Sequence, residues 1–262
     1  MAKIGRQEKK ELEQEGKDLA SRCRRELGLG IEPISDIFGL IERFNVILLR
    51  YPSDNPKLSA FITKNLEGYT FIYLNTKRTL GHQIFSAAHE FKHLLYDKDL
   101  NARICNPEQD QNDPSEIVAD AFAGAFLMPL DGVRSIWREC FGNDKCQFIT
   151  PKHVIKMQQI FHVSYSAILN ALLQAEIISR PIYGKLRKMA SPEHADALKT
   201  LTRKMGYSTS LIEETSPEIP RILIESLHDN YEKGLVSFGK VKYLLSLWNK
   251  TPNELGFEPY YD

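Results

Sequence analysis

His89, Glu90 and His93 have side chains and a spacing that suit metal chemistry. They lie in the pentapeptide HEFKH at positions 89–93. On a helix, the two histidines would lie one turn apart on the same face, with about 6 Å between their Cβ atoms, so both imidazoles could reach one ion. Glu90 would project roughly 100° around the helix from His89, where its carboxylate could accept a proton from a water on the metal. We therefore expect a Zn²⁺ site with His89 and His93 as ligands and Glu90 as the catalytic base.

A catalytic zinc site needs a third protein ligand and an open position for water. Glu116 is the candidate, since it begins an apolar segment 23 residues after His93, far enough for a second helix to dock against the first. Asp120 follows on the same helical face, where it could accept the second ring N–H of a ligating histidine. The run DPSE at 113–116 also fits a helix start, so Glu116 could instead close a capping box. Because HEFKH lacks a third ligand, we expect Glu116 to bind the metal.

Peptide hydrolysis at such a site also needs a group that stabilises the developing oxyanion. His82 lies seven residues before His89 and shares its helical face, so it could point into the same cleft. Tyr96 and His162 are other candidates, and each of the three could instead be a packed or solvated residue. An extended substrate could pair with the edge strand of a neighbouring hairpin, because proteases of this kind recognise main chain before side chains.

The segments around these residues have clear periodicities. Apolar residues at helical spacing predict four helices in this part of the chain, at 6–27, 33–44, 81–97 and 113–128. Runs rich in β-branched and aromatic residues predict three strands, at 46–51, 58–63 and 69–74. Asn65 and Gly68 mark a turn between the last two strands, so we expect an antiparallel hairpin there. The polar, aperiodic residues 97–113 predict a loop between the two metal-site helices.

The remainder of the chain has only helical patterns. They predict helices at 151–161, 165–176, 192–206, 217–233 and 237–249, with a basic connector at 181–191. The first two have helix-turn-helix spacing. We place a domain boundary near 145–150, which gives a zinc metallopeptidase domain at 1–147 and a helical domain at 148–262. The predicted fold class is α+β, with a small antiparallel sheet and two metal-site helices followed by a mainly α-helical C-terminal region.

The composition is that of an ordinary globular protein. The 34 basic and 34 acidic side chains balance, so there is no global field to attract nucleic acid or an anionic membrane. No stretch approaches the roughly 18 apolar residues of a membrane span, and the first residues do not resemble a signal peptide. We expect a cytoplasmic protein without a membrane partner. Four scattered cysteines are predicted to be free thiols, namely Cys23, Cys105, Cys140 and Cys146.

The motif and its surroundings resemble the ImmA/IrrE-type metallopeptidases. The resemblance covers roughly residues 15–178 and depends on FSAAHEFKHLL at 85–95, EIVADAFAGAFLMP at 116–129 and VSYSAILNALLQAEIIS at 163–179. The pattern LSAFI…FIYLN before the metal helix is similar to the family's hairpin. This chain has His82 where the family often has basic residues, and Asp120 where it often has Asn. The last 80 or so residues have no counterpart in the resemblance.

The resemblance implies zincin-like metal helices, with zinc on His89, His93 and Glu116 and with Glu90 catalytic. It also implies a protein substrate, because family members commonly cleave a helix-turn-helix repressor and so release stress-response or mobile-element genes. We therefore expect a zinc-dependent endopeptidase that acts on a transcriptional repressor.

Two other functions fit parts of the same sequence. The protein could sequester a repressor without cutting it, in which case the metal would be structural and a fourth ligand, for which Cys105 is the candidate, would complete the site. It could instead bind DNA directly through residues 151–176, where Asn170 and Gln174 could reach bases. The second helix of that pair contains no Lys or Arg, so phosphate contacts would be poor and direct nucleic-acid binding is not expected. The notable basic cluster lies elsewhere and is expected to be a solvated face, comprising Lys185, Arg187, Lys188, Arg203 and Lys204.

Overall fold

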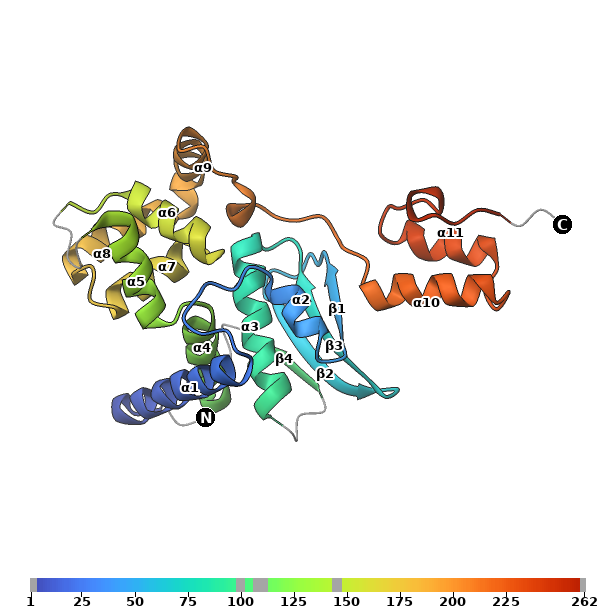
Figure 1. Cartoon of the computed structure of the whole chain (residues 1–262), viewed down its shortest axis with the longest axis horizontal. Helices are drawn as coiled ribbons and strands as arrows, with labels where there is room; N and C mark the ends of the chain where they lie inside the picture. The colour runs from blue at the N-terminus through green and yellow to red at the C-terminus, as the bar shows by residue number, and fades with distance from the viewer. Residues whose placement is uncertain (1–3, 98–101, 106–112, 143–147, 260–262) are drawn as a thin grey trace.

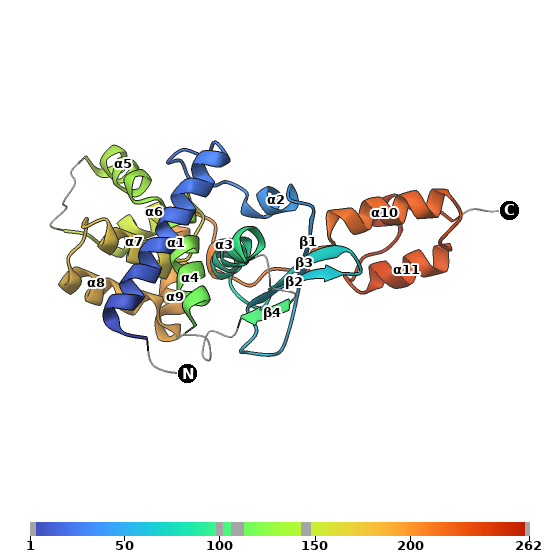
Figure 2. The ribbon, with the colours of Figure 1, turned by 90° about the horizontal axis from the view of Figure 1, so that it is seen from below.

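The computed structural model describes residues 4–97, 102–105, 113–142 and 148–259. A small sheet with its covering helices forms the middle of the molecule, and helices alone form the rest (Figure 1). The predicted α+β class with a mainly helical C-terminal region is confirmed. The last two long helices project from the side of the sheet where β1 lies (Figure 2).

The sheet has four strands in the order β1-β3-β2-β4. Their bounds are β1 (Val46–Tyr51), β2 (Ala60–Leu66), β3 (Tyr69–Asn75) and β4 (Ala102–Cys105). β2 and β3 form the predicted antiparallel hairpin, with its turn at Glu67 and Gly68. Both turn residues have positive φ, 51° and 85°, as a two-residue type I′ turn requires. β1 pairs with β3 in parallel, so the whole sheet is mixed rather than antiparallel.

β4 corrects two expectations about the sheet edge. The prediction of a loop throughout 97–113 is wrong at 102–105, where β4 pairs with β2. The hairpin consequently has no free edge at residues 60–63, since β2 lies between β3 and β4 there. The edge on this side belongs to β4, and an extended substrate could not pair with the hairpin at these residues.

Four helices lie beside the sheet. They are α1 (Arg6–Glu26), α2 (Ile37–Glu42), α3 (Leu80–Tyr96) and α4 (Pro114–Leu127). α2 and α3 pack on the sheet, and two of the four, α3 and α4, hold the metal-site residues. α3 packs on β2 and β3, and α4 packs between α3 and α1. α1 approaches α4 closely at Gly16, where an added Cβ would lie 2.3 Å from the carbonyl oxygen of Val118. The absence of a side chain at Gly16 therefore permits the α1–α4 contact.

Helices make up most of the described C-terminal half. The long helices are α5 (Leu130–Phe141), α6 (Pro151–Phe161), α7 (Tyr165–Gln174), α8 (Arg180–Arg187), α9 (Ala195–Lys204), α10 (Arg221–Glu232) and α11 (Phe238–Ser246). Short 3₁₀ helices lie at Lys188–Ala190, Pro192–His194, Ser210–Ile212 and Asn253–Leu255. An irregular stretch between α9 and α10 forms two isolated bridges, Arg50 with Glu218 and Thr79 with Glu214. The expected basic connector at 181–191 is wrong, because α8 occupies most of it. Pro181 is in the first turn of α8, a position where proline favours a helix.

The buried apolar residues form two separate clusters. The larger one joins the sheet and helices α1–α9, and it contains residues on both sides of position 147. The smaller one is built by α10, α11 and Phe257. Tyr51 and Arg50 at the end of β1 connect the two parts, since the Tyr51 hydroxyl donates to Leu247 and Arg50 pairs with Glu218 at 2.6 Å. The division into domains at 147 and 148 stays a prediction.

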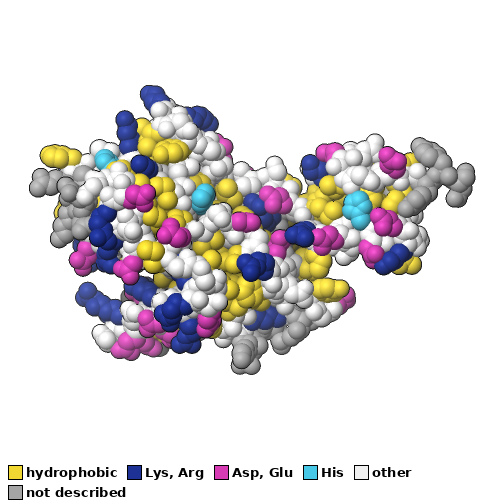
Figure 3. Space-filling view, viewed as in Figure 1, with side chains coloured by type: hydrophobic (Ala, Val, Ile, Leu, Met, Phe, Trp, Pro, Cys, Tyr) yellow, Lys and Arg dark blue, Asp and Glu magenta, His cyan; other side chains and the backbone are white. Residues whose placement is uncertain are grey.

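The surface, the helices and the cysteines can be compared with what the composition suggested. In the part of the chain that the structure describes, no helix has both the length and the apolar character to cross a membrane. Basic and acidic side chains are interspersed on the face shown in Figure 3. Cys23 and Cys140 are free thiols, as predicted, whereas Cys146 and the Cys105 side chain lie outside the described part.

Candidate metal centre

α3 presents His89 and His93 on one face, one helical turn apart. Their Nε2 atoms are 3.1 Å from each other, and both rings are buried. The end of the helix is fixed by Lys64 of β2, whose ammonium donates to the carbonyl oxygens of His93 and Asp97 at 2.8 and 2.7 Å. A cation at the C-terminal end of a helix satisfies carbonyl groups that have no partner within the helix. The sheet thus holds the position of the second histidine.

Glu116 approaches both histidines from the first turn of α4. Its Oε2 atom lies 3.0 Å from His89 Nε2, and its Oε1 atom lies 3.4 Å from His93 Nε2. Asp113 is the N-cap of α4 and accepts from the backbone of Ser115. The Glu116 carboxylate therefore faces the histidines instead of closing a capping box, and the structure brings together the three residues predicted to hold the metal.

The three side chains fit a tetrahedral metal ion. Their ligand atoms all lie within 4.8 Å of one another, and all three residues are buried. Zinc with bonds of about 2.0–2.1 Å to nitrogen and oxygen separates its ligand atoms by about 3.3 Å. The distances of 3.0, 3.1 and 3.4 Å between these atoms agree with that geometry. The group could therefore hold a metal ion with a fourth position open.

Each histidine is oriented by a carboxylate at its other ring nitrogen. His89 Nδ1 lies 2.9 Å from Asp120 Oδ1, the contact that the sequence predicted for Asp120. His93 Nδ1 lies 2.5 Å from Asp97 Oδ2, a contact that the sequence analysis missed. A hydrogen on Nδ1 that is donated to a carboxylate leaves the lone pair on Nε2, where a metal would bind. Asp97 could have been found from its position four residues after His93, the spacing that also relates Glu116 to Asp120.

Asp97 also links the end of α3 to the start of α4. Its carboxylate accepts from Lys92 Nζ at 2.9 and 3.0 Å and from the hydroxyl of Ser115 at 2.9 Å. Lys92 is itself buried and donates to the same Ser115 hydroxyl at 2.9 Å. Since Ser115 precedes Glu116, one cluster of Lys92, Asp97 and Ser115 fixes His93 and Glu116 relative to each other.

The carboxylates of half-buried Asp97 and buried Glu116 are held in their charged form. Burial acts to raise the pKa of Asp97, but hydrogen bonds from His93, Lys92 and Ser115 outweigh it and hold that pKa well below its usual range. Burial likewise acts to raise the pKa of Glu116, and hydrogen bonds and charge from His89 and His93 lower it overall. Glu116 is therefore an anion near neutral pH, as a metal ligand must be.

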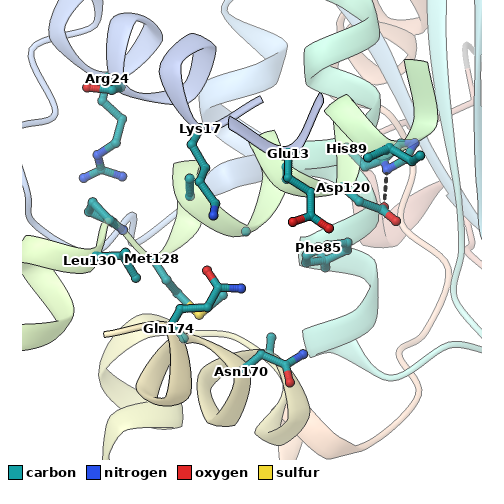
Figure 4. A pocket seen from close by; sticks show the side chains of 18 of the residues that line it. Glu13, Lys17, Arg24, Phe85, His89, Asp120, Met128, Leu130, Asn170 and Gln174 are labelled. Atoms are coloured by element: carbon teal, nitrogen blue, oxygen red, sulfur yellow. Dashed lines mark hydrogen bonds and ion pairs between the residues drawn. The ribbon is translucent and has the colours of Figure 1, made fainter. Parts of the chain in front are cut away.

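A cavity of about 1280 Å³ opens beside these residues. His89, Glu90 and Glu116 line it, as does Asp120 (Figure 4). Glu90 is fully buried in its wall. The predicted catalytic base therefore lines the same cavity as two of the three candidate ligands, His89 and Glu116, whereas His93 is buried behind them.

His82 lines the same cavity, whereas Tyr96 and His162 do not. Its Nε2 atom lies 3.1 Å from the hydroxyl of Ser59. The surrounding protein and the positive charge of Arg78 lower the pKa of His82, so the ring is neutral at pH 7. Of the three candidates, His82 is therefore the one that lines the cavity, and its role stays a prediction.

Cys105, the suggested fourth ligand of a structural site, has its side chain outside the described residues. Among the residues that are described, the one group of side chains suited to a metal ion is His89, His93 and Glu116.

Comparison with known proteins agrees with this geometry. Residues 41–173 match a peptidase family described as the IrrE N-terminal-like domain, and the match includes α3, α4 and the α6–α7 pair. It covers just over half of the 262 residues. A search of curated proteins gives no match. The family supports a metallopeptidase, in agreement with the buried group of two histidines and one glutamate. The chain belongs to the IrrE N-terminal-like peptidase family.

Proposed function

We propose that the protein is a zinc-dependent endopeptidase, with His89, His93 and Glu116 as ligands and Glu90 as the general base. The convergence of three ligand atoms beside a cavity that Glu90 also lines is the observation that supports this proposal. Three protein ligands with an open position are typical of catalytic zinc sites, whereas structural sites usually have four.

The chain's own residues can provide the proton transfers of peptide hydrolysis. When bound, zinc supplies Lewis acidity towards the scissile carbonyl and makes a water molecule more acidic. The Glu90 carboxylate accepts the proton of the attacking water and later returns it to the nitrogen of the leaving amine. Asp120 and Asp97 hold the histidine rings through their Nδ1 atoms, so the Nε2 atoms keep their direction during the reaction.

His82 is our candidate for stabilising the oxyanion. A neutral ring can donate one hydrogen bond to the oxygen of the scissile carbonyl, and Ser59 at 3.1 Å helps to orient the ring. In this role His82 would affect turnover more than substrate binding, because the charge on that oxygen develops in the transition state.

The substrate that we propose is a helix-turn-helix transcriptional repressor, whose cleavage releases stress-response or mobile-element genes. Support for this substrate comes from the resemblance to the ImmA/IrrE-type peptidases. A cytoplasmic site of action follows from the same proposal.

The test is to incubate the zinc-loaded protein with the product of a neighbouring repressor gene and to follow fragments by intact-mass spectrometry. The wild-type protein should cut at a defined position, and a chelator should stop the reaction. Glu90→Gln keeps the size of the side chain but cannot accept the proton, so it should lose cleavage while retaining zinc near the wild-type stoichiometry. Undiminished cleavage by this variant would exclude Glu90 as the base.

The same assay separates cleavage from sequestration. A protein that binds the repressor but leaves it intact, with equal effect in the wild type and in Glu90→Gln, would favour a non-proteolytic regulator with a structural metal. That result would contradict the proposed peptidase activity.

A further inference from the structure

The cavity at the metal centre continues away from it as a groove between α1 and α7. Side chains from both helices line it, together with residues of α4 that lie between them. Figure 4 shows Glu13 and Lys17 pointing from α1 into this space and Gln174 pointing into it from α7. Its volume of about 1280 Å³ is larger than the roughly 300–1,000 Å³ of most small-molecule sites. The dimensions suit a polypeptide segment.

One wall of this α1–α7 groove is held rigidly. Gly16 lets α1 lie against α4, as described above. Near its end, the buried guanidinium of Arg24 donates to the main-chain oxygens of Gly30 at 2.8 Å and of Phe126 in α4. α1 is thus fixed to the catalytic core at two points and can act as a permanent side of the binding site.

The other wall is the helix whose sequence suggested DNA recognition. Asn170 and Gln174 are exposed and line the groove, and the Asn170 amide oxygen accepts from the Tyr183 hydroxyl at 2.8 Å. These are the two residues that could have reached bases. In the folded protein they face α1 and the metal centre. Side-chain amides can donate to and accept from a peptide main chain, and the small Ala167 and Ala171 beside them leave room for it.

The first wall carries two charges along the groove. Glu13 lies towards Asp120 and His89, and Lys17 lies one turn further from the metal centre (Figure 4). Both side chains are half-buried, and in the described part of the chain neither has an oppositely charged group within salt-bridge distance. Glu13 and Lys17 lie four residues apart on one face of α1 without forming a close ion pair, so each half-buried charge can take an oppositely charged group from a ligand.

We propose that the α1–α7 groove binds an extended segment of the polypeptide substrate and recognises two of its charges. A basic residue faces Glu13, nearer the scissile bond, and an acidic residue faces Lys17. Side chains at i and i+4 of a helix are about 6 Å apart, and alternate residues of an extended chain are about 6.6 Å apart. The two charged residues of the substrate are therefore separated by one residue. This inference rests on the proposed peptidase function, because the groove begins at the metal centre.

The test uses the full chain with zinc and the Glu90→Gln substitution, which leaves bound peptides uncut. The protein is immobilised and exposed to a fully random dodecapeptide library, and the retained peptides are sequenced. The retained peptides should contain a basic and an acidic residue separated by one residue. One of the two orders, basic before acidic or acidic before basic, should occur at least about 3-fold more often than the other. Exchanging the two charges, as Glu13→Lys with Lys17→Glu, should invert that preference, since the helix and its net charge are unchanged.

A matched control is available on the same helix. Lys10 and Glu15 are exposed residues of α1 that do not line the groove, so Lys10→Glu with Glu15→Lys should leave the preferred order unchanged. Absence of retained peptides, absence of a preferred order, or a preference that survives the Glu13 and Lys17 exchange would overturn the proposal. Occupation of the groove by a second copy of the chain would give the first of these results.

Failure of this inference can be told apart from failure of the proposed function. Retained peptides are incubated with zinc-loaded protein that has Glu90 intact. Peptides that show the charge order but stay uncut would contradict the peptidase function and leave the groove assignment in place. Peptides that are cut but show no preferred order of charges would contradict the groove assignment and leave the peptidase function in place.

Discussion

His93 Nδ1 lies 2.5 Å from Asp97 Oδ2, and this carboxylate also binds Lys92 and Ser115. Asp97→Asn replaces the anion with a neutral amide and so weakens the interaction that orients His93. We expect zinc affinity to fall about 10–100-fold. Competition with a chromogenic chelator measures the affinity, and the melting temperature of the zinc-free protein reports any structural loss separately.

Asp54→Asn is a control for the Asp97 experiment. Asp54 is exposed and pairs with Lys77 at the surface, so its substitution should not change zinc affinity. Equal affinities of Asp97→Asn and the wild type would show that Asp97 does not position the ligand.

Zinc should stabilise the folded protein through the three ligands. A ligand at about 100 times its Kd adds about 2.7 kcal/mol to the free energy of unfolding, which for a protein of this size raises the melting temperature by about 5–10 °C. Glu116→Ala leaves two histidines without the third ligand and should abolish most of that rise. Scanning calorimetry with and without zinc measures it. A rise of the same size in Glu116→Ala would exclude Glu116 as a ligand.

Gly16 should tolerate no side chain. In Gly16→Ala the new Cβ would lie 2.3 Å from the Val118 carbonyl oxygen and 2.8 Å from the Ala121 Cβ, so α1 would have to move from α4. We expect a loss of about 1–3 kcal/mol in the free energy of unfolding. Gly184 in α8 has open space around it, and Gly184→Ala should raise stability by up to about 1 kcal/mol through helix propensity. Urea unfolding compares the two, and similar effects at both sites would contradict the close α1–α4 contact.

Removal of residues 219–262 should leave the metal centre intact. α10 and α11 have their own apolar cluster, and Glu218, which pairs with Arg50, is retained. We expect the zinc-dependent rise in melting temperature to stay within about 3 °C of its value in the full chain, a difference of about 1 kcal/mol or less. Loss of zinc binding in the shortened chain would show that the last two helices support the site.

Helices and strands could be predicted from the sequence where one pattern of apolar residues, helical or alternating, extends over many residues. The long helices α1, α3 and α4 and the strand β1 agree closely with the predicted ranges. β4 was missed because four residues are too few for an alternating pattern, and its pairing with β2 depends on chain that is distant in sequence. Pro181 was interpreted as a break, although proline in the first turn begins a helix.

α5 was missed for a different reason. Pro129 ends the preceding helix, and the residues after it were not assigned, even though Val133 and Trp137 are four residues apart and both fully buried. That spacing is a helical signal and could have predicted α5.

The sequence could predict those relationships in the candidate site that depend on spacing within one helix. His89 and His93 share a face because they are four residues apart in one helix, and Asp120 follows Glu116 by the same spacing in another. The docking of these helices depends on tertiary packing, so the distances between Glu116 and the histidines could not be derived from sequence. The contact between Asp97 and Ser115 was missed because it joins the ends of two helices across 18 residues of sequence, and their approach depends on tertiary packing.

The orientation of α7 likewise could not be predicted from the sequence, because it depends on how the helices pack in the folded protein. Helix-turn-helix spacing is a local property of residues 151–176, and it does not determine which side of the second helix faces solvent. Asn170 and Gln174 line the same cavity as His89 and Glu116, so in the folded protein the side chains that a DNA-binding function would need face the cavity of the candidate metal centre.

The hydrogen bonds among Lys92, Asp97 and Ser115 close the chain between α3 and α4 at its two ends. A chain segment whose two ends are held together can change in length at little cost in free energy, since the entropy of loop closure varies slowly with loop length. Since β4 in this stretch pairs with β2, the chain can change in length on either side of β4 while Asp97 and Ser115 keep His93 and Glu116 in place.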